Sequence, residues 1–252
     1  MQCSDLNILA ARTSIGKTAF AINLAYNAAI RGKRRVGIFS LEMNREQLAQ
    51  RFVALDSGIQ QQTLRMGDFD DEHWAPLVAT IGKLSDLGEH GIRIDDTPGI
   101  TLTQMRSRAR RWIAEYNIEL IIVDYLQLVN TGEKKGFENR QQEVATISRQ
   151  LKAMARELNV PVLALAQLSR ALEARQSKVP ILSDLRESGG IENDADVVMF
   201  IYRDEVYNPD TTRRGETDII IAKQRNGPLG EVTLNFDQDK SRFSNPTSAA
   251  HN

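Results

Sequence analysis

The sequence is poor in the residues that build disulfides and metal centres, and it has no long apolar run. Cys3 is the single cysteine among 252 residues, which excludes an internal disulfide and a cysteine-rich zinc site and fits a reducing compartment such as the cytoplasm. No window approaches eighteen consecutive apolar residues, so no membrane-spanning segment is expected, and the N-terminus lacks the apolar core of a secretory signal. The net charge is −1, so a nucleic acid would have to bind at local basic loops or in a channel built by several subunits.

What remains is typical of one large α/β domain. With 41% hydrophobic residues the chain can bury a sizeable core. Short apolar runs alternate with longer segments of helical periodicity, which predicts a mostly parallel, twisted sheet flanked by helices, with a C-terminal β-hairpin around Asn226-Gly227-Pro228. We expect this domain to occupy residues 1–244 and the tail 245–252 to be disordered. Because Met1 precedes the first predicted strand so closely, an excised domain is expected.

Residues 11–18 (Ala-Arg-Thr-Ser-Ile-Gly-Lys-Thr) form the strongest motif. They match the phosphate-loop pattern G-x-x-x-x-G-K-[ST] except at the first position. An apolar run suited to a strand precedes the motif and a helical pattern follows it, which is the context that the motif requires. Backbone N–H groups would then wrap phosphates, Lys17 would reach the β- and γ-phosphates, and Thr18 would hold Mg²⁺. The alternative is a helix that merely begins with a Gly-Lys-Thr turn. The predicted nucleotide-binding set is Thr13, Ser14, Ile15, Gly16, Lys17, Thr18 and Ala19.

Three polar residues stand where predicted strands end. Asp124 closes the all-apolar strand 120–124, where a carboxylate is costly unless it is paired or bound to a metal, so it is the candidate that organises Mg²⁺. Glu42 follows the strand 36–39 and could polarise the attacking water. Gln167 follows the strand 161–166 and could bond the γ-phosphate, a role that periodicity alone does not indicate. The alternatives are a turn cap for Asp124, an N-cap or surface position for Glu42, and an ordinary strand end for Gln167.

Two sets of cations invite opposite interpretations. Lys223 and Arg225 are separated by one residue on an extended stretch, so they face the same way. Such a pair usually decorates a solvated hairpin, but a nucleotide site without an evident local arginine favours an arginine finger supplied by a neighbour. By contrast, Arg149, Lys152 and Arg156 form a helical stripe that is predicted to be a solvated face.

Two loops are candidates for nucleic-acid contact. Residues 132–136 (Gly-Glu-Lys-Lys-Gly) follow the strand of Asp124, and residues 184–192 follow the strand of Gln167. The adjacent glycines Gly189 and Gly190 would let backbone N–H groups approach a phosphate closely. The alternative for the second loop is an ordinary glycine turn before a helix.

Taken together, these segments resemble the C-terminal RecA-like motor domain of DnaB-type replicative helicases. The resemblance rests on residues 4–18, 39–43 (Phe-Ser-Leu-Glu-Met), 122–128 (Ile-Val-Asp-Tyr-Leu-Gln-Leu), 138–144, 166–170, 186–196 and 222–228, which follow the family's order. It covers nearly the whole chain, to about Phe243. No single piece is specific, but the ordered string is.

The resemblance implies a RecA-like phosphate-loop NTPase that uses ATP and Mg²⁺ and acts as a homo-hexamer on single-stranded DNA, with a primase and a helicase loader as partners. It implies catalytic roles for Lys17, Glu42, Arg51, Gln167, Lys223 and Arg225, of which the last two enter the neighbouring subunit's site. It assigns the metal to Thr18 and Asp124. DNA contacts are assigned to Arg186, Glu187, Gly189 and Gly190.

Two departures from the family's pattern bear on these expectations. Thr13 stands where the family commonly has proline, which would fix φ and preorganise the loop, so nucleotide affinity is the quantity affected. We expect this sequence to lack the family's N-terminal helical domain and linker helix, which leaves ring formation by this chain open. Two rival functions also stay open: a RadA-like recombination or repair ATPase, and a nucleotide-binding scaffold without turnover, although Glu42 and Arg225 disfavour the scaffold.

Overall fold

The protein was analysed as a computed structural model, which describes residues 1–130, 140–188 and 190–246. Within these ranges, nine strands form a single sheet in the order β3-β2-β4-β5-β1-β6-β7-β8-β9. Their bounds are β1 Leu6–Ala11, β2 Val36–Ser40, β3 Ile92–Asp95, β4 Leu120–Asp124, β5 Val162–Gln167, β6 Val197–Tyr202, β7 Glu216–Gln224, β8 Gly230–Asp237 and β9 Arg242–Ser244.

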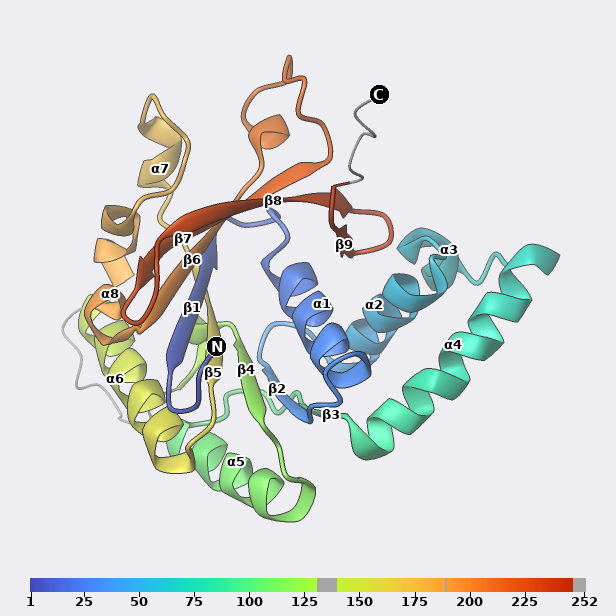
Figure 1. The fold of residues 1–252 in the computed structure, drawn as a ribbon, viewed down its shortest axis with the longest axis horizontal. Coiled ribbons are helices and arrows are strands. Elements are labelled where there is room, and N and C mark those ends of the chain that lie inside the picture. Colours follow the sequence, from blue (N-terminus) through green and yellow to red (C-terminus); the bar gives the residue numbers. More distant parts are fainter. Residues whose placement is uncertain (131–139, 189, 247–252) are drawn as a thin grey trace.

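The helices alternate with the strands along the first two thirds of the chain (Figure 1). They are α1 Lys17–Ile30, α2 Arg45–Ser57, α3 Gln61–Met66, α4 Asp71–His90, α5 Leu102–Tyr116, α6 Arg140–Leu158, α7 Ala171–Ala174 and α8 Ile191–Asp194, with 3₁₀ turns η1 Leu126–Leu128, η2 Leu182–Ser188 and η3 Asp204–Val206. No helix of the described ranges is long and apolar enough to cross a membrane.

Strand direction divides the sheet into two parts and gives it two functional edges. Strands β3, β2, β4, β5, β1 and β6 are parallel, whereas β7, β8 and β9 continue antiparallel, which confirms the predicted α/β fold class with its C-terminal hairpin. Parallel strands end at the same edge, here called the loop edge, where β1, β2, β4 and β5 finish. Because β7 runs against β6, it finishes at the other edge, here called the far edge, where β1 and β6 begin (Figure 1).

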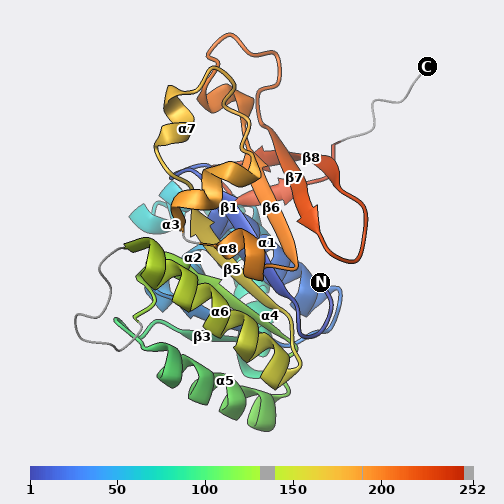
Figure 2. The same ribbon diagram turned by 90° about the vertical axis from the view of Figure 1, so that its left-hand side faces the viewer.

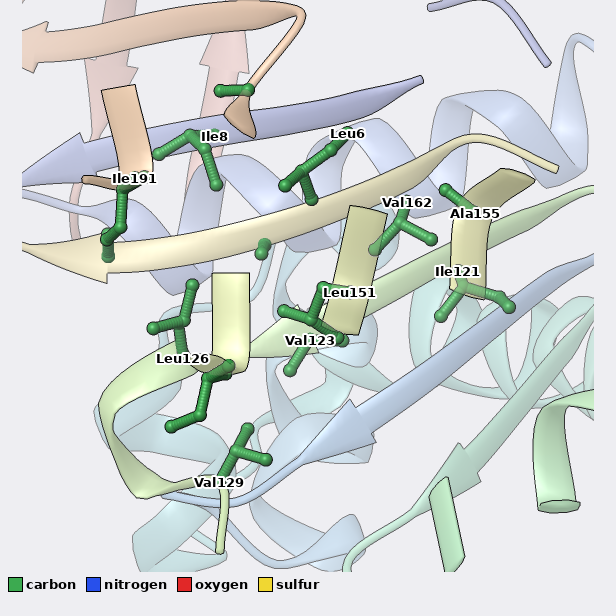
Figure 3. Close-up of a cluster of buried hydrophobic side chains, with 14 of the residues drawn as sticks. Leu6, Ile8, Ile121, Val123, Leu126, Val129, Leu151, Ala155, Val162 and Ile191 are labelled. Carbon is green, nitrogen blue, oxygen red and sulfur yellow. The ribbon is translucent and has the colours of Figure 1, made fainter. Parts of the chain in front are cut away.

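Helices cover both faces of the sheet because its strands are apolar on both sides. Helices α5 and α6 pack on one face, and α1, α2 and α4 lie on the other (Figures 1 and 2). Strand alternation sends Ile8 of β1 into the first core and its neighbour Leu9 into the second. Figure 3 shows Leu151 and Ala155 of α6 facing the β4 and β5 side chains, and Ile191 of α8 beside Ile8. The strands are therefore held rigidly where the polar strand ends emerge.

Local signals explain most helix boundaries. Asn44 caps α2, because its side chain accepts from the Gln47 N–H at 2.9 Å and its own N–H donates to the Gln47 side chain. Gly58 ends the helix at φ +74°. Thr101 and Gln104 make the same reciprocal cap for α5. The short elements α3, α7 and β9 were not predicted from the sequence, and α3 has only a C-terminal signal, Gly67 at φ +71°.

Candidate nucleotide-binding site

The phosphate loop joins β1 to α1 and depends on one glycine. Gly16 is the N-cap of α1 at φ +115°, a conformation that L side chains rarely adopt, and a Cβ there would come within 3.4 Å of Phe236. No side chain in the described ranges caps this helix, so the first-turn N–H groups stay available to an anion at the positive end of the helix dipole. Ile15 is 1% exposed and anchors the loop in the core, so only its backbone can serve a ligand.

A cleft of about 320 Å³ opens over this loop, a volume within the range of small-molecule sites. Among the predicted residues it brings together Thr13, Ser14, Gly16, Lys17, Thr18, Ala19, Glu42, Arg51 and Gln167. Asp124 stands behind Thr18 rather than in the cleft wall. The fold therefore brings these predicted side chains together at the loop edge.

Two cations of the cleft are partly desolvated. The Lys17 ammonium donates to the carbonyls of Ala11 and Arg12, at 3.2 and 3.3 Å. Burial lowers the pKa of Lys17, against the opposing charges of Asp124 and Glu42. Burial likewise lowers the pKa of Arg51 on α2. Both cations line the same cleft. A negatively charged ligand there would be attracted to them more strongly than in water, because the cations are partly desolvated.

Asp124 and Thr18 make a fitting pair for a divalent cation. The Thr18 hydroxyl donates to Asp124 Oδ2 at 2.7 Å, and the carboxylate is 3% exposed. Burial is the main cause that raises the pKa of Asp124 to about 6, and the nearby Glu42 adds to it, while the Thr18 bond and Lys17 oppose it. Asp124 Oδ1 has no hydrogen-bond partner in the described part of the chain. An orphaned carboxylate oxygen beside a hydroxyl suits Mg²⁺, which takes oxygen ligands and usually shares them with substrate phosphates.

Glu42 reaches the cleft because two strand ends are tied together. Ser40 pairs with Asp124 in the β2–β4 register, and the Leu41 N–H donates to the Asp124 carbonyl at 2.7 Å. The Ser40 hydroxyl then bonds the Met43 carbonyl at 2.6 Å, which closes the turn around Glu42. The Glu42 side chain is exposed at the cleft wall, where a water molecule could approach it.

Gln167 is bonded to the phosphate loop itself. Its side-chain amide donates to the Thr13 hydroxyl at 2.8 Å. Its backbone exchanges bonds with the Gln127 amide, at 3.3 Å for the Gln167 N–H and 3.1 Å for the carbonyl. Thr13 thus supplies a hydroxyl contact that a proline at this position could not make.

Sequence reasoning missed Arg12, which links the loop to the segment after β5. Arg12 is 8% exposed; its guanidinium donates to the Leu168 carbonyl at 2.8 Å and to Glu173 of α7 at 2.7 and 2.8 Å. An arginine inside a phosphate loop carries no sequence signal for a partner more than 150 positions away.

It also missed the cleft wall that comes from α3 and the C-terminal strands. This wall consists of Gln61, Phe236, Gln238 and Ser241. Phe236 stacks on Phe243 with ring centroids 4.2 Å apart, and the Gln61 amide donates to the Gln238 carbonyl at 2.9 Å. The Gln61–Gln238 bond joins residues 177 positions apart in the chain, so no local pattern could have indicated that α3 contributes to this wall.

Lys223 and Arg225 lie at the far edge, away from the cleft. The Arg225 N–H donates to the Asp196 carbonyl, and the Asp196 N–H donates to that of Leu6, both at 2.9 Å. Arg225 is therefore level with the first residue of β1, roughly 16 Å along the strand from its last residue at 3.3 Å per residue. Neither cation lines the cleft of its own chain.

The predicted DNA contacts fall in a less fully described segment. Arg186 and Glu187 belong to η2, but their side chains are outside the described residues, as are Gly189 and the loop 132–136. Gly190 precedes α8 at φ +92°, a position that favours glycine.

Comparison with known proteins decides the family. The model of the "DnaB-like helicase C terminal domain" family matches residues 1–245. The chain belongs to this family. It is 51% identical over 244 residues to the replicative DNA helicase DnaB of Geobacillus stearothermophilus and 50% identical to the replicative DNA helicase DnaC of Bacillus subtilis (strain 168). In both cases the match covers 97% of this chain and 53% of the relative, so the chain spans about half the length of these curated relatives.

Solved structures of similar proteins share the fold. One of them, described as an ATPase domain, superposes with a TM-score of 0.91 at 37% identity, over 98% of this chain and 86% of that one. A DnaB-like replicative helicase, solved in a study of its interactions with primase, gives 0.90 at 38% identity, over 98% of this chain and 58% of that one. The resemblance inferred from the motifs is thereby confirmed.

Proposed function

We propose that this chain is the motor of a ring-forming, ATP-driven helicase that moves along single-stranded DNA and separates the duplex at the replication fork. The observation that carries this proposal is the division of the charged residues between the two edges of the sheet. Lys17, Glu42 and Asp124 stand at the loop edge, whereas Arg225 stands at the far edge of the same chain. A site that needs all of them requires two chains, as in a ring.

In the proposed mechanism the loop edge binds ATP and prepares the water. The N–H groups of the phosphate loop and the Lys17 ammonium bind the phosphates. Thr18 and Asp124 would hold Mg²⁺, which neutralises charge on the phosphate oxygens when it is bound. Glu42 accepts the proton of the attacking water, and Arg51 and Gln167 contact the γ-phosphate region. When the γ-phosphate leaves, Gln167 would lose its contact with that phosphate and keep only its bond to Thr13.

The neighbouring subunit completes the chemistry. Arg225 acts as the finger that stabilises charge on the transferred phosphoryl group, and Lys223 enters beside it. We place Arg186, Glu187, Gly189 and Gly190 along the DNA backbone in the channel of a homo-hexamer. A channel that collects such loops from several subunits suits a chain with a net charge of only −1. A primase, a helicase loader and a cytoplasmic location follow from the family and belong to this proposal.

One assay separates this function from its rivals. ATP hydrolysis and strand separation are measured on a forked duplex, with single-stranded DNA added or withheld, over a range of protein concentrations. The helicase hydrolyses ATP faster with DNA and separates the fork; a recombination ATPase hydrolyses ATP without separating it; a scaffold binds ATP without turnover. Lys17→Ala is the control that abolishes both activities while the fold stays intact. Turnover without strand separation, in an assembled ring, would contradict the proposal.

The DNA loop has its own test. Arg186→Ala is expected to weaken single-strand affinity about equally for all sequences and to lower the salt slope by roughly one, because one phosphate contact is lost. Arg34→Ala, at an exposed arginine paired with Glu119, is the matched control and should leave both quantities unchanged. An Arg186 effect that depends strongly on base sequence would argue against backbone contact.

A further inference from the structure

Asp196 is a buried carboxylate at the far edge, between α8 and β6. It is 6% exposed and accepts from the Leu6 N–H at 2.8 Å and from the Lys152 ammonium. Burial alone would raise the pKa of Asp196, but these two donors and the charge of Arg225 bring it below its ordinary value. The prediction that Lys152 belongs to a solvated stripe is wrong, because its side chain is 14% exposed and paired with this carboxylate. The far edge therefore contains a fixed negative charge.

Arg225 is held by one edge of its guanidinium group. Its Nη2 donates to the Asn193 carbonyl at 2.8 Å, and its Nε lies 3.7 Å from Asp196 Oδ1. Its backbone N–H is bonded to the Asp196 carbonyl as well. Nη1 makes no bond to the residues that the structure describes, and the side chain is 45% exposed. The planar fork thus keeps an open edge for a second, external partner.

The second cation is anchored to the same short helix. Lys223 Nζ donates to the Glu192 carbonyl, one residue before the carbonyl that binds Arg225. Helix α8 is itself fixed, since Ile191 is fully buried beside Ile8 (Figure 3). A free arginine side chain has many rotamers, and ordering it in another subunit's site would oppose catalysis with a loss of entropy. In this structure the Arg225 side chain is already held by contacts within its own chain, before a neighbouring subunit binds.

We propose that Asp196 is a positioning residue for the finger: with the last carbonyls of α8 it holds Arg225 extended, so that the open edge of the guanidinium can enter the neighbouring site. This inference rests on the trans role of Arg225 proposed above. Asp196 does not line the cleft over the phosphate loop, so its effect on turnover would be exerted through Arg225. Its loss should therefore damage the finger side of an interface and leave the pocket side of the same chain intact.

The test uses Asp196→Asn, which keeps the size and an acceptor for the Leu6 N–H but removes the charge. Turnover should fall about 10- to 100-fold with unchanged ATP affinity, the scale of a misplaced catalytic group. Lys152→Gln is the matched control, because it removes the other cation on Asp196 without touching Arg225. Its turnover should stay within about threefold of the parent, and its melting temperature should fall at least as far as that of Asp196→Asn.

Mixed assemblies then locate the defect. Glu42→Gln has a damaged pocket and a whole finger, so adding it to Asp196→Asn creates interfaces with a good pocket and a good finger. Single-turnover ATP hydrolysis should recover there, as it should with Arg225→Ala in place of Asp196→Asn. If Asp196→Asn does not fold, Asp196→Glu, which keeps the charge but moves it by one methylene, replaces it with the same expected finger-side defect.

Three outcomes overturn the inference. Unchanged turnover in the Asp196 variants means that the carboxylate does not position the finger. Recovery with Arg225→Ala but not with an Asp196 variant means that the Asp196 defect lies in the fold or the pocket, and it leaves the proposed function standing. Failure of Arg225→Ala itself to recover, with mixed assembly verified, removes the shared site and this inference together.

Discussion

The charged residues proposed for catalysis at the loop edge and Arg225 at the far edge of the same sheet are held in different ways. At the loop edge Lys17, Arg51 and Asp124 are partly or fully desolvated. Burial lowers the pKa of Lys17 and Arg51 and raises that of Asp124, which favours the neutral form of each group. At the far edge the Arg225 side chain is 45% exposed and donates to the backbone carbonyl of Asn193. Desolvated charges suit a ligand that binds in the cleft of the same chain, whereas a charge at the surface can contact another molecule. The two edges therefore hold the two sets of charged residues that the proposed shared site needs.

Strand direction is the physical origin of this difference. Parallel strands deliver their carboxyl ends, and the loops that follow, to one edge, which collects polar side chains from β1, β2, β4 and β5. The antiparallel strand β7 returns the chain to the far edge, where Lys223 lies near its end and Arg225 directly follows it. Subunits that place the far edge of one chain against the loop edge of the next would join the halves in a head-to-tail ring.

The largest effect is expected for Arg225→Ala. A pure population should lose on the order of 10³ or more in ATP turnover, the scale of an arginine finger, because every interface lacks its finger. ATP affinity, measured by equilibrium titration with Mg²⁺, should be unchanged, since no residue of the cleft is altered. Arg34→Ala, an exposed arginine close to the start of β2, is the control for loss of a surface cation. A large loss of ATP affinity would place Arg225 in its own chain's site instead.

The loop edge should separate chemistry from binding. Glu42→Gln removes a base but no phosphate contact, so turnover should fall by about 10²- to 10³-fold while ATP affinity is kept. Lys17→Ala removes a charge-assisted bond to the phosphates and should weaken ATP binding by roughly 10- to 100-fold. Turnover assays and equilibrium titration on the same preparations check both. If Glu42→Gln hydrolyses ATP at the parent rate, the general base is another group.

The smallest effect is expected for Thr13→Ala. This change deletes the hydroxyl that bonds Gln167 but leaves the backbone N–H groups of the loop in place, so ATP affinity should hold while turnover changes by about fivefold, the value of one neutral hydrogen bond. Thr13→Ser retains the hydroxyl and should behave like the parent. Equal turnover in all three proteins would show that the Thr13–Gln167 bond has no part in the reaction.

Much of the loop edge could be predicted from the sequence because its signals are local. The phosphate loop lies within eight residues, and Glu42, Asp124 and Gln167 each follow an apolar run that is recognisable by itself. The rule that parallel strands end together then places them in one cleft. The role of Arg51 came only from the resemblance to the family. For Lys223 and Arg225, the spacing indicated that both face the same way and the lack of a local arginine favoured a finger from a neighbour, while the resemblance assigned that role to this pair.

Only the tertiary structure decided the rest. Gln61, Phe236 and Ser241 form a cleft wall from segments far apart in the chain, and Arg12 is tied to Glu173 across the site. The burial of Lys152 against Asp196, contrary to the predicted solvated stripe, arises because α6 packs against α8 and β1, where Lys152 also donates to the Ser4 carbonyl. Periodicity reports which side of a helix or strand is apolar. It cannot report strand order and direction, and these placed Arg225 and the cleft over the phosphate loop at opposite edges of the sheet of one chain.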